Sequence, residues 1–334
     1  MEELKGKIFK NIHQIGIVTK NARETIRRYF ENYGIGPWNL WEFGPEMVEN
    51  MQVRGKRADY RMIVATCKKM NIDFEIIEPL DNKSIYYSFL NMYGEGIQHI
   101  NYDTFDYDQA LDVLKNRGVT VSQFGNLEGK HKYIYFDTER DTGHIIEISG
   151  NLPGFKRRDP EEIYPSKEIE IKDNNPVFKK VSQIGIVVLD LIRTVQNLND
   201  KYTIGPWKFY RFNPTEVEDM RFMGKKVSYC YKMAVCNLEG VELALVQPED
   251  SSSIFSTFIK KFGQGPCFVS FEVDNLCNAL ELVNNKGMNV TQSGIWYGRR
   301  FSFINSEADL KFSSYIYEYN KGFEKPNPYR IYPN

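Results

Sequence analysis

The second half of this chain repeats the first at an offset of 169 positions. KNIHQIGIV at residues 10–18 returns as KKVSQIGIV at 179–187, and GIGPWNLWEF returns as TIGPWKFYRF. The copies also end alike, in GFKRRDPEEIYP and GFEKPNPYRIYP. Self-similarity on this scale indicates a duplicated folding unit, and 334 residues are enough for two domains with separate cores. We therefore expect domains over residues 1–165 and 178–334, joined by a charged linker over 166–177.

Each half divides again into two similar modules. The apolar strand QIGIVT precedes a segment that opens at Asn21 and carries apolar side chains at helical spacing until Gly34. Strands over NLWEF, DYRMIVAT and DFEIIEPL follow it. A second strand, HINYDTF, leads into a helix over DQALDVLKNRG and then into strands over TVSQFG, KYIYFDT and HIIEIS. The pattern predicts an α+β fold of four modules, each a strand, a helix and several strands.

Charge and composition exclude several classes of protein. The formal net charge of −1 gives no reason to expect a nucleic-acid partner, and the short, interrupted apolar segments give none to expect a membrane. The N-terminal residues MEELKGKIFK lack the apolar core of a secretory signal. The five cysteines have no CxxC spacing, which argues against a disulfide framework or a zinc knuckle. We expect a soluble, cytoplasmic protein.

Four polar residues occupy equivalent places in the two modules of the first half. Gln14 and His99 each begin the first strand of a module, while Glu75 and Glu147 each lie in the last strand. Folding the modules together would bring the four side chains to one point. An amide, an imidazole and two carboxylates suit a six-coordinate divalent cation, with two positions left for a chelating substrate or water. The pattern predicts a metal site.

Strand alternation separates Gln14 from the histidine beside it. Gln14 shares a face with Gly16, whereas His13 shares the opposite face with Ile15, so only the glutamine should face the site. By the same parity His144 points away from Glu147, and His131 stands in the polar stretch EGKHK, read as a loop. We expect these three histidines to be ordinary surface or core groups.

The motifs QIGIV, GIQHINY, FEIIEPL and GHIIEIS, in this order, resemble the vicinal oxygen chelate superfamily of glyoxalases, bleomycin resistance proteins and extradiol dioxygenases. The similarity is nearest to methylmalonyl-CoA epimerase and glyoxalase I and covers nearly the whole chain. It implies two tandem domains of paired βαβββ modules with curved mixed sheets. It also places the metal ligands at Gln14, Glu75, His99 and Glu147, the ligand order of glyoxalase I.

The resemblance departs from the epimerase at one place. The epimerase has a further catalytic glutamate in the strand that reads DYRMIV here, where this chain has none. A base copied from that enzyme is therefore absent, and the resemblance to glyoxalase I leaves Glu75 or Glu147 as the catalytic base.

The second half serves as an internal control. The four ligand positions map there onto Gln183, Ala244, Phe268 and Glu318, and an alanine and a phenylalanine cannot bind a metal. We interpret this half as a degenerate copy that stabilises, caps or dimerises with the first and helps to shape the pocket. Only the first two modules together give a complete site, within one chain or across a homodimer; a monomer with pseudo-twofold halves and a homodimer both remain open.

The function expected from the resemblance is metal-dependent α-proton chemistry. One divalent ion (Zn, Ni, Co, Mn or Mg) would stabilise the enolate of a carbonyl substrate, a thioester or an aromatic ketone, in an isomerase, epimerase or lyase. One alternative is a metal-free binding or resistance protein, which the abundant aromatic residues would suit. An extradiol dioxygenase fits less well, because it needs two histidines and a carboxylate.

The pair Arg299–Arg300 could meet a phosphate or carboxylate or be solvated surface.

Overall fold

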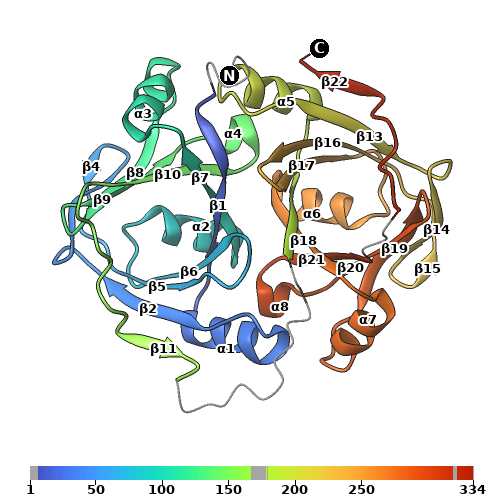
Figure 1. Ribbon diagram of the computed structural model, residues 1–334, viewed down its shortest axis with the longest axis horizontal. Helices are drawn as coiled ribbons and strands as arrows, with labels where there is room; N and C mark the ends of the chain where they lie inside the picture. Colours follow the sequence, from blue (N-terminus) through green and yellow to red (C-terminus); the bar gives the residue numbers. More distant parts are fainter. Residues whose placement is uncertain (1–6, 167–177, 179, 319–321, 334) are drawn as a thin grey trace. The chain divides into compact units, whose positions relative to one another are not determined.

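The computed structural model describes residues 7–166, 178, 180–318 and 322–333. The chain forms two compact units, one made of Met1–Arg140 and His144–Asn175 and the other of Asp141–Gly143 and Pro176–Asn334 (Figure 1). The predicted linker over 166–177 lies, from residue 167 onward, outside the described residues. Each unit combines helices with one large mixed sheet, so the predicted α+β duplication is confirmed.

The first half of the chain folds into these elements, in order: β1 (Phe9–Val18), α1 (Ala22–Tyr33), β2 (Trp38–Phe43), β3 (Val48–Val53), β4 (Lys56–Arg57), β5 (Met62–Cys67), β6 (Asp73–Pro79), α2 (Ile85–Tyr93), β7 (Gly96–Thr104), α3 (Tyr107–Asn116), β8 (Val121–Leu127), β9 (His131–Phe136), α4 (Glu139–Thr142), β10 (Ile145–Asn151) and β11 (Glu162–Tyr164). Alternation alone does not predict β3, β4 or α2. The VENMQV segment of β3 lacks a run of apolar residues, and the aromatic residues of α2 are equally suited to a strand.

The sheet of the first unit curls on itself. Its strand order is β11-β2-β5-β6-β1-β7-β10-β9-β8-β3-β4, so β2 and β3 stand towards opposite ends of the order. Only residues 44–47 separate these two strands in the chain. A four-residue connection cannot span a flat sheet of this width, because strands lie roughly 4.8 Å apart. The sheet must therefore bend round until its ends approach, and α2 lies inside the ring of strands that results (Figure 1).

The second half follows the same plan. Its elements are β12 (Lys180–Val187), α5 (Leu191–Asp200), β13 (Trp207–Phe212), β14 (Val217–Phe222), β15 (Lys225–Lys226), β16 (Tyr231–Leu238), β17 (Val241–Pro248), α6 (Ile254–Phe262), β18 (Gly265–Val273), α7 (Leu276–Asn284), β19 (Val290–Trp296), β20 (Arg299–Ile304), α8 (Glu307–Leu310), β21 (Ser313–Glu318) and β22 (Arg330–Tyr332). Its strand order, β15-β14-β19-β20-β21-β18-β12-β17-β16-β13-β22, is that of the first sheet read from the other end. The repeated closing segments form the matching edge strands β11 and β22.

Helix α1 packs against the outer face of the first sheet. The Asn21 side chain caps it by accepting a hydrogen bond from the Glu24 backbone N–H at 2.9 Å, and Gly34 ends it in the left-handed conformation with φ of 69°. Tyr29 of the buried stripe meets Phe74 of β6, with ring centroids 6.0 Å apart. Because side chains alternate along a strand, this contact turns the neighbouring Glu75 towards the inside of the curl.

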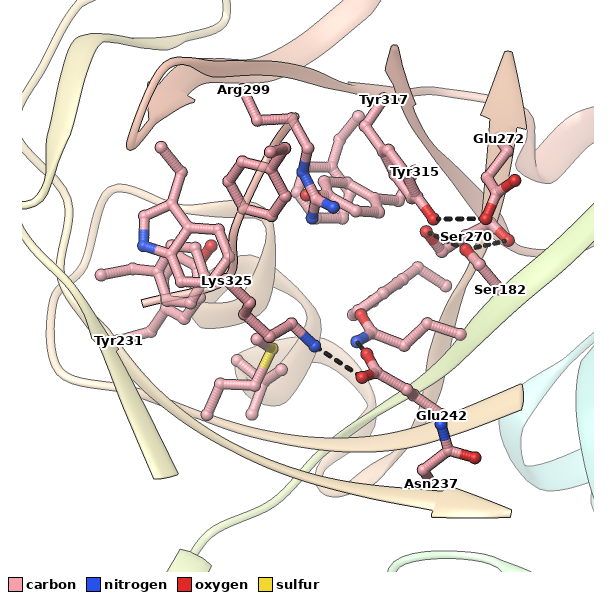
Figure 2. A pocket seen from close by; sticks show the side chains of 18 of the residues that line it. Ser182, Tyr231, Asn237, Glu242, Ser270, Glu272, Arg299, Tyr315, Tyr317 and Lys325 are labelled. Carbon is pink, nitrogen blue, oxygen red and sulfur yellow. Dashed lines mark hydrogen bonds and ion pairs between the residues drawn. The ribbon is translucent and has the colours of Figure 1, made fainter. Parts of the chain in front are cut away.

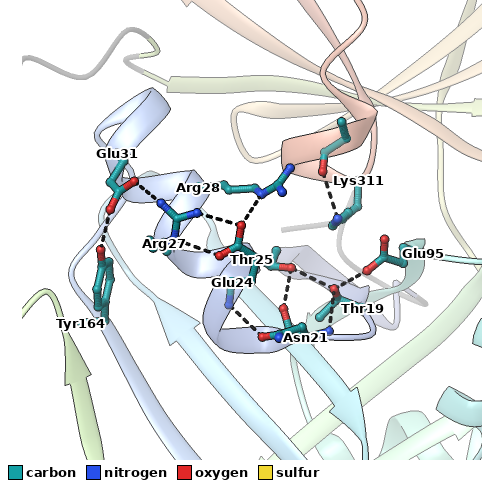
Figure 3. A network of polar contacts seen from close by, with 11 residues as sticks. Thr19, Asn21, Glu24, Thr25, Arg27, Arg28, Glu31, Glu95, Tyr164 and Lys311 are labelled. Atoms are coloured by element: carbon teal, nitrogen blue, oxygen red, sulfur yellow. Dashed lines mark hydrogen bonds and ion pairs between the residues drawn. The ribbon is translucent and has the colours of Figure 1, made fainter.

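A polar network on α1 attaches the edge strand β11 (Figure 3). Glu24 accepts hydrogen bonds from Arg27 and Arg28, which lower the pKa of its carboxyl to about 2. Arg27 also contacts Glu31, whose other oxygen accepts a hydrogen bond at 3.1 Å from the Tyr164 hydroxyl of β11. Exposed ion pairs contribute little stability one by one. This chain of contacts instead fixes where β11 lies against the helix.

A ring lies over a glycine of the first strand in each unit. A Cβ placed on Gly16 of β1 would stand 1.8 Å from the His99 imidazole, and one on Gly185 of β12 would stand 1.9 Å from the Phe268 ring. The glycine of the repeated QIGIV motif therefore provides space for the ring of the neighbouring strand. Any larger residue would push the ring into the inside of the sheet.

The substitution Gly185→Ala tests this contact without touching the first unit. Because the Phe268 ring has to move, we expect unfolding to become easier by about 1–3 kcal/mol, the usual cost of overpacking a core. The measurement is chemical denaturation followed by tryptophan fluorescence. Gly265→Ala is the matched control, since its nearest neighbouring atom would be 3.6 Å away. Equal stability of the two variants would contradict the interpretation.

Candidate metal centre

Strand pairing brings Glu75 and His99 to either side of one glycine. The strands β6, β1, β7 and β10 are neighbours in that order. Gly16 of β1 pairs with Glu75 of β6 on one side and with His99 of β7 on the other. Residues paired across neighbouring strands point to the same face of a sheet. Both side chains therefore project into the curl, above a residue that has no side chain of its own.

The next row of the sheet carries the other two predicted residues. Gln14 of β1 and Glu147 of β10 both pair with Asn101 of β7. Asn101 lies two residues beyond His99, and side chains two apart on a strand share a face. The four predicted ligands thus stand on one inner face of four adjacent strands, as the sequence pattern predicted.

Three of the four side chains meet closely. The His99 Nε2 atom lies 3.4 Å from a carboxylate oxygen of Glu75 and 3.2 Å from Oε2 of Glu147, and candidate ligand atoms of the three residues all lie within 4.8 Å of one another. His99 is fully buried and Glu147 is 3% exposed. Gln14 is buried and lines the cavity above this cluster. The Glu75, His99 and Glu147 side chains are referred to below as the carboxylate–histidine cluster.

The cluster attracts positive charge. Complete burial by itself would lower the pKa of His99, but the carboxylates of Glu147 and Glu75 outweigh burial and raise it to about 9. Two carboxylates converging in a low-dielectric interior repel each other and stabilise any cation between them. Such a site suits either a proton on the imidazole or a metal ion.

A bulge in β7 positions the imidazole. Gly16 pairs with His99 and Ile17 pairs with Ile97, so Gln98 is an extra residue without a partner on β1. The buried Gln98 side chain turns to His99, and its Oε1 accepts a hydrogen bond from Nδ1 at 2.6 Å. With Nδ1 held in this way, Nε2 is directed at the two carboxylates, the arrangement that orients histidine ligands of metals. Sequence alternation gave no sign of this role.

A cavity of about 80 Å³ lies above the cluster inside the first sheet. Strands β1 to β3 and β5 to β10 each contribute to its lining, which includes Gln14, Glu75, Asn101, Tyr135 and Glu147. The curl of the sheet is therefore what encloses the site.

Tyrosine hydroxyls form the polar part of the surrounding shell. The Tyr86 hydroxyl of α2 donates a hydrogen bond to the Tyr135 hydroxyl at 2.9 Å, and the Tyr135 ring meets the His99 ring at 4.9 Å, edge to face. Burial, and then the negative charge of Glu147, raise the pKa of Tyr135 well above its ordinary value. Both tyrosines therefore remain neutral at any ordinary pH. Aromatic residues with this role were not singled out from the sequence.

The prediction that His13 faces away from the site is wrong. Ile12 pairs with Tyr102 and Gln14 pairs with Asn101, so His13 is the extra residue of a second bulge in the strand pair and lines the cavity beside Gln14. Its Nδ1 atom lies 3.5 Å from an oxygen of Asp103, at the mouth. A bulge cancels the strict alternation on which the prediction rested.

The two remaining histidines differ from each other. His144 is a satisfied core group, as predicted, because its Nε2 shares a hydrogen bond of 2.8 Å with the buried Tyr102 hydroxyl. His131 was predicted to lie in a loop, but it is the first residue of β9 and lines the cavity. Its ring stacks on Phe155 with centroids 5.2 Å apart.

The predicted equivalent of Glu147 in the second half is corrected by the strand register. His99 pairs with Ile145 and Phe268 pairs with Ser313, so the place of Glu147 belongs to Tyr315 and not to Glu318. The turn before β20 is one residue shorter than its counterpart before β9, which shortens the repeat offset beyond that point. Glu318 instead receives a hydrogen bond from Arg300 at 2.8 Å. The second unit therefore lacks three of the four ligand residues, and only Gln183 remains.

The chain belongs to the glyoxalase/bleomycin resistance protein/dioxygenase superfamily, whose family model matches residues 13–136 and 182–303. The two matches begin at His13 and Ser182, at the start of the repeated strand of each unit. The family predicted from the motifs is thus confirmed, together with its duplication along the chain. Enzymes of several reaction types and binding proteins share this fold, so membership alone does not fix the reaction.

Two solved structures with TM-scores above 0.5 share the fold of this chain, and a third is similar over less of it. A mutant of 4-hydroxymandelate synthase from Streptomyces coelicolor is similar over 94% of this chain and 94% of its own, with 10% identity and a TM-score of 0.58. A xylose isomerase-like TIM barrel/4-hydroxyphenylpyruvate dioxygenase fusion protein is similar over 95% of this chain and 50% of its own, with 10% identity and a TM-score of 0.51. Methylmalonyl-CoA epimerase from Mycobacterium tuberculosis matches 43% of this chain and 90% of its own, with 17% identity and a TM-score of 0.34.

No curated protein matches the chain in sequence. In the part of the chain that the structure describes, no helix has the length and apolar character needed to span a membrane.

The donor set of the cluster fits a divalent metal ion. His99 Nε2 and Glu147 Oε2 are buried and have no hydrogen-bond partner among the described residues, although they face each other at 3.2 Å. Unsatisfied buried polar atoms are costly unless something binds them. A divalent cation accepts an imidazole nitrogen and two carboxylates together and would satisfy both atoms.

Gln98→Leu tests the positioning of the imidazole. Loss of the bond to Nδ1 should weaken the affinity for Zn²⁺ or Mn²⁺ by about 10- to 100-fold, as loss of such supporting contacts does elsewhere. Calorimetric titration of metal into the protein provides the measurement, with thermal unfolding as a check that the fold is retained. Gln109→Leu, on the exposed side of α3, should leave the affinity unchanged. Equal affinities of the two variants would show that Gln98 does not orient His99.

Proposed function

We propose that the first unit is a metal-dependent isomerase, epimerase or lyase that removes the α-proton of a small carbonyl compound. The carboxylate–histidine cluster carries this proposal, because it combines a cation site with two groups that can accept a proton. Gln14, Glu75, His99 and Glu147 would hold the metal. A bound divalent ion would offset the negative charge that develops on the carbonyl oxygen when the α-proton leaves.

The two glutamates differ in their access to the cavity. The Glu75 side chain is 14% exposed and Glu147 only 5%. A base has to reach the substrate proton and later exchange it with solvent. We assign that role to Glu75, released from the ion when it acts as the base, and assign Glu147, deeper and closer to His99, to holding the metal throughout. Both residues remain the catalytic candidates predicted from the sequence.

The size of the cavity limits the substrate. A space of about 80 Å³ accommodates a carbonyl group with its neighbouring carbons and oxygens, while the rest of a thioester or aromatic ketone extends past the mouth. Lys68 and Arg157 line the cavity, and Lys68 is paired with Asp73 at 3.3 Å. An acidic group on the extending part of the substrate would be stabilised there.

The two alternatives predict different donor sets. An extradiol dioxygenase binds iron with two histidines and one carboxylate, whereas the cluster has one histidine and two carboxylates. A metal-free binding protein would leave two carboxylates around one imidazole, whose proton compensates only one of the two negative charges. Each observation favours the cation-dependent site proposed above.

Hydrogen exchange at the α-carbon is the test of the proposal. In D₂O the metal-loaded protein should introduce deuterium at the α-carbon of an α-branched acyl thioester or an aryl α-hydroxyketone, read by mass spectrometry. Glu75→Gln should slow this exchange by about 10²- to 10⁴-fold, the usual contribution of a general base. Exchange that persists in the metal-stripped protein, or exchange that requires oxygen, would contradict the proposal. The absence of exchange with both compounds would also contradict it.

Metal analysis tests Glu147 as a ligand. Glu147→Gln should lose most of its bound metal, because it removes one of the two charges that hold the cation. Glu242→Gln, on the β17 strand of the second unit that corresponds to β6, is the control and should change neither the metal content nor the rate of exchange. If Glu147→Gln retained its metal in full, Glu147 would be ruled out as a metal ligand.

A further inference from the structure

The second unit encloses a cavity of about 310 Å³, much larger than the cavity of about 80 Å³ in the first (Figure 2). This volume falls within the range of pockets for small organic ligands. The prediction that the second half stabilises, caps or dimerises with the first does not account for a cavity of this size.

The residues that would hold a metal are replaced together. Ala244 stands at the position of Glu75, Phe268 at that of His99 and Tyr315 at that of Glu147, as the paired registers show. Two hydroxyls of the surrounding shell are lost as well, because Phe255 and Phe303 replace tyrosines. The floor of this cavity is therefore apolar and cannot bind a cation as the first unit would.

Aromatic rings form walls suited to a planar molecule. Phe212 and Trp296 stack with centroids 4.6 Å apart, and Phe268 meets Phe303 edge to face at 5.3 Å. All four side chains line the cavity. Rings of this kind prefer stacked and edge contacts with a further ring, each adding to the free energy of burial.

The acidic groups of the cavity already have partners. Glu242 contacts the Lys325 ammonium at 2.5 Å and accepts a hydrogen bond from the Gln183 amide at 3.0 Å. Glu272 accepts a hydrogen bond from the Tyr317 hydroxyl at 3.2 Å (Figure 2). The charge of Glu242 is thus offset by Lys325, while Glu272 is held by a neutral hydroxyl.

Arg299 is the exception to this balance. Its guanidinium lies 4.1 Å from the Tyr317 ring centroid and 4.4 Å from that of Phe323, and it points into the cavity (Figure 2). Among the described residues it forms no ion pair with a carboxylate. Its neighbour Arg300 is exposed and contacts Glu318 at 2.8 Å. Arg300 is thus solvated surface, while Arg299 points into the aromatic cavity with no carboxylate paired to it among the described residues.

We infer that the second unit binds, without a metal, a planar aromatic molecule that carries a carboxylate. The ring system would lie between the aromatic walls, and the carboxylate would receive paired hydrogen bonds from the Arg299 guanidinium. The rings of Tyr317 and Phe323 hold the guanidinium in place, which reduces the entropy lost on binding. This site is separate from the proposed metal centre and does not depend on it.

Binding of 2-naphthoate, followed by calorimetry and by tryptophan fluorescence, tests the inference. The wild-type protein should bind 2-naphthoate saturably. Its affinity for the neutral 2-naphthamide should be lower by about tenfold or more, because the amide loses the hydrogen bonds between two charged groups. This comparison needs no variant. No saturable binding of 2-naphthoate, or equal affinity for the acid and the amide, would overturn the inference.

Substitutions then locate the site. Arg299→Met should lower the affinity for 2-naphthoate about tenfold or more and remove the preference over the amide. Arg300→Met is the matched control and should bind like the wild type. Equal affinities of the two variants would overturn the inference.

A last comparison separates this site from the first unit. Glu147→Gln and treatment with a chelator should leave 2-naphthoate binding unchanged, even where they remove metal. Binding lost with the metal would place the aromatic acid in the first unit and overturn the inference while leaving the proposed function in place. Unchanged binding with no metal in the wild type would support the inference and contradict the proposed function.

Discussion

The contact between a ring and a glycine organises the centre of both units. Gly16 and Gly185 let the ring of the neighbouring strand lie directly over the first strand of each sheet. In the first unit the ring is the His99 imidazole, held with its Nε2 atom between two carboxylates. In the second it is the phenyl ring of Phe268, which forms the floor of an aromatic cavity. The same geometry therefore holds a polar ring in one unit and an apolar ring in the other.

Much of the first site could be predicted from the sequence because it depends on regular strands. The repeat located equivalent strands, and the equivalent places of Glu75 and Glu147 in the two modules predicted that they meet, where strand register sets them beside Gly16 and Asn101. His99 followed from the same reasoning. These predictions needed only the period of two along a strand and the order of the modules, both of which the chain obeys in these segments.

The predictions failed where one residue was inserted or removed. The bulges at His13 and Gln98 turn an extra side chain towards the inside, and neither QIGIV nor GIQHI signals a bulge by its composition. A hairpin shorter by one residue moves the equivalent of Glu147 from Glu318 to Tyr315. An inserted or deleted residue of this kind costs a sheet little stability, yet each one changes which residue faces the site. Only the strand register of the folded structure therefore reveals them.

The difference between the two sites is explained by the cost of an incomplete cluster. Removing one member of a buried charged group leaves the others unpaired, which costs more than keeping the whole group or replacing it entirely. The second unit accordingly has no partial cluster: apolar or neutral side chains stand at all three positions, and Phe268 preserves the ring contact. Glu242, one of the two acidic residues that line the cavity, is compensated by Lys325. With no carboxylate at the three cluster positions, the aromatic walls and Arg299 determine the inferred ligand, which is an anion where the first unit is proposed to hold a cation.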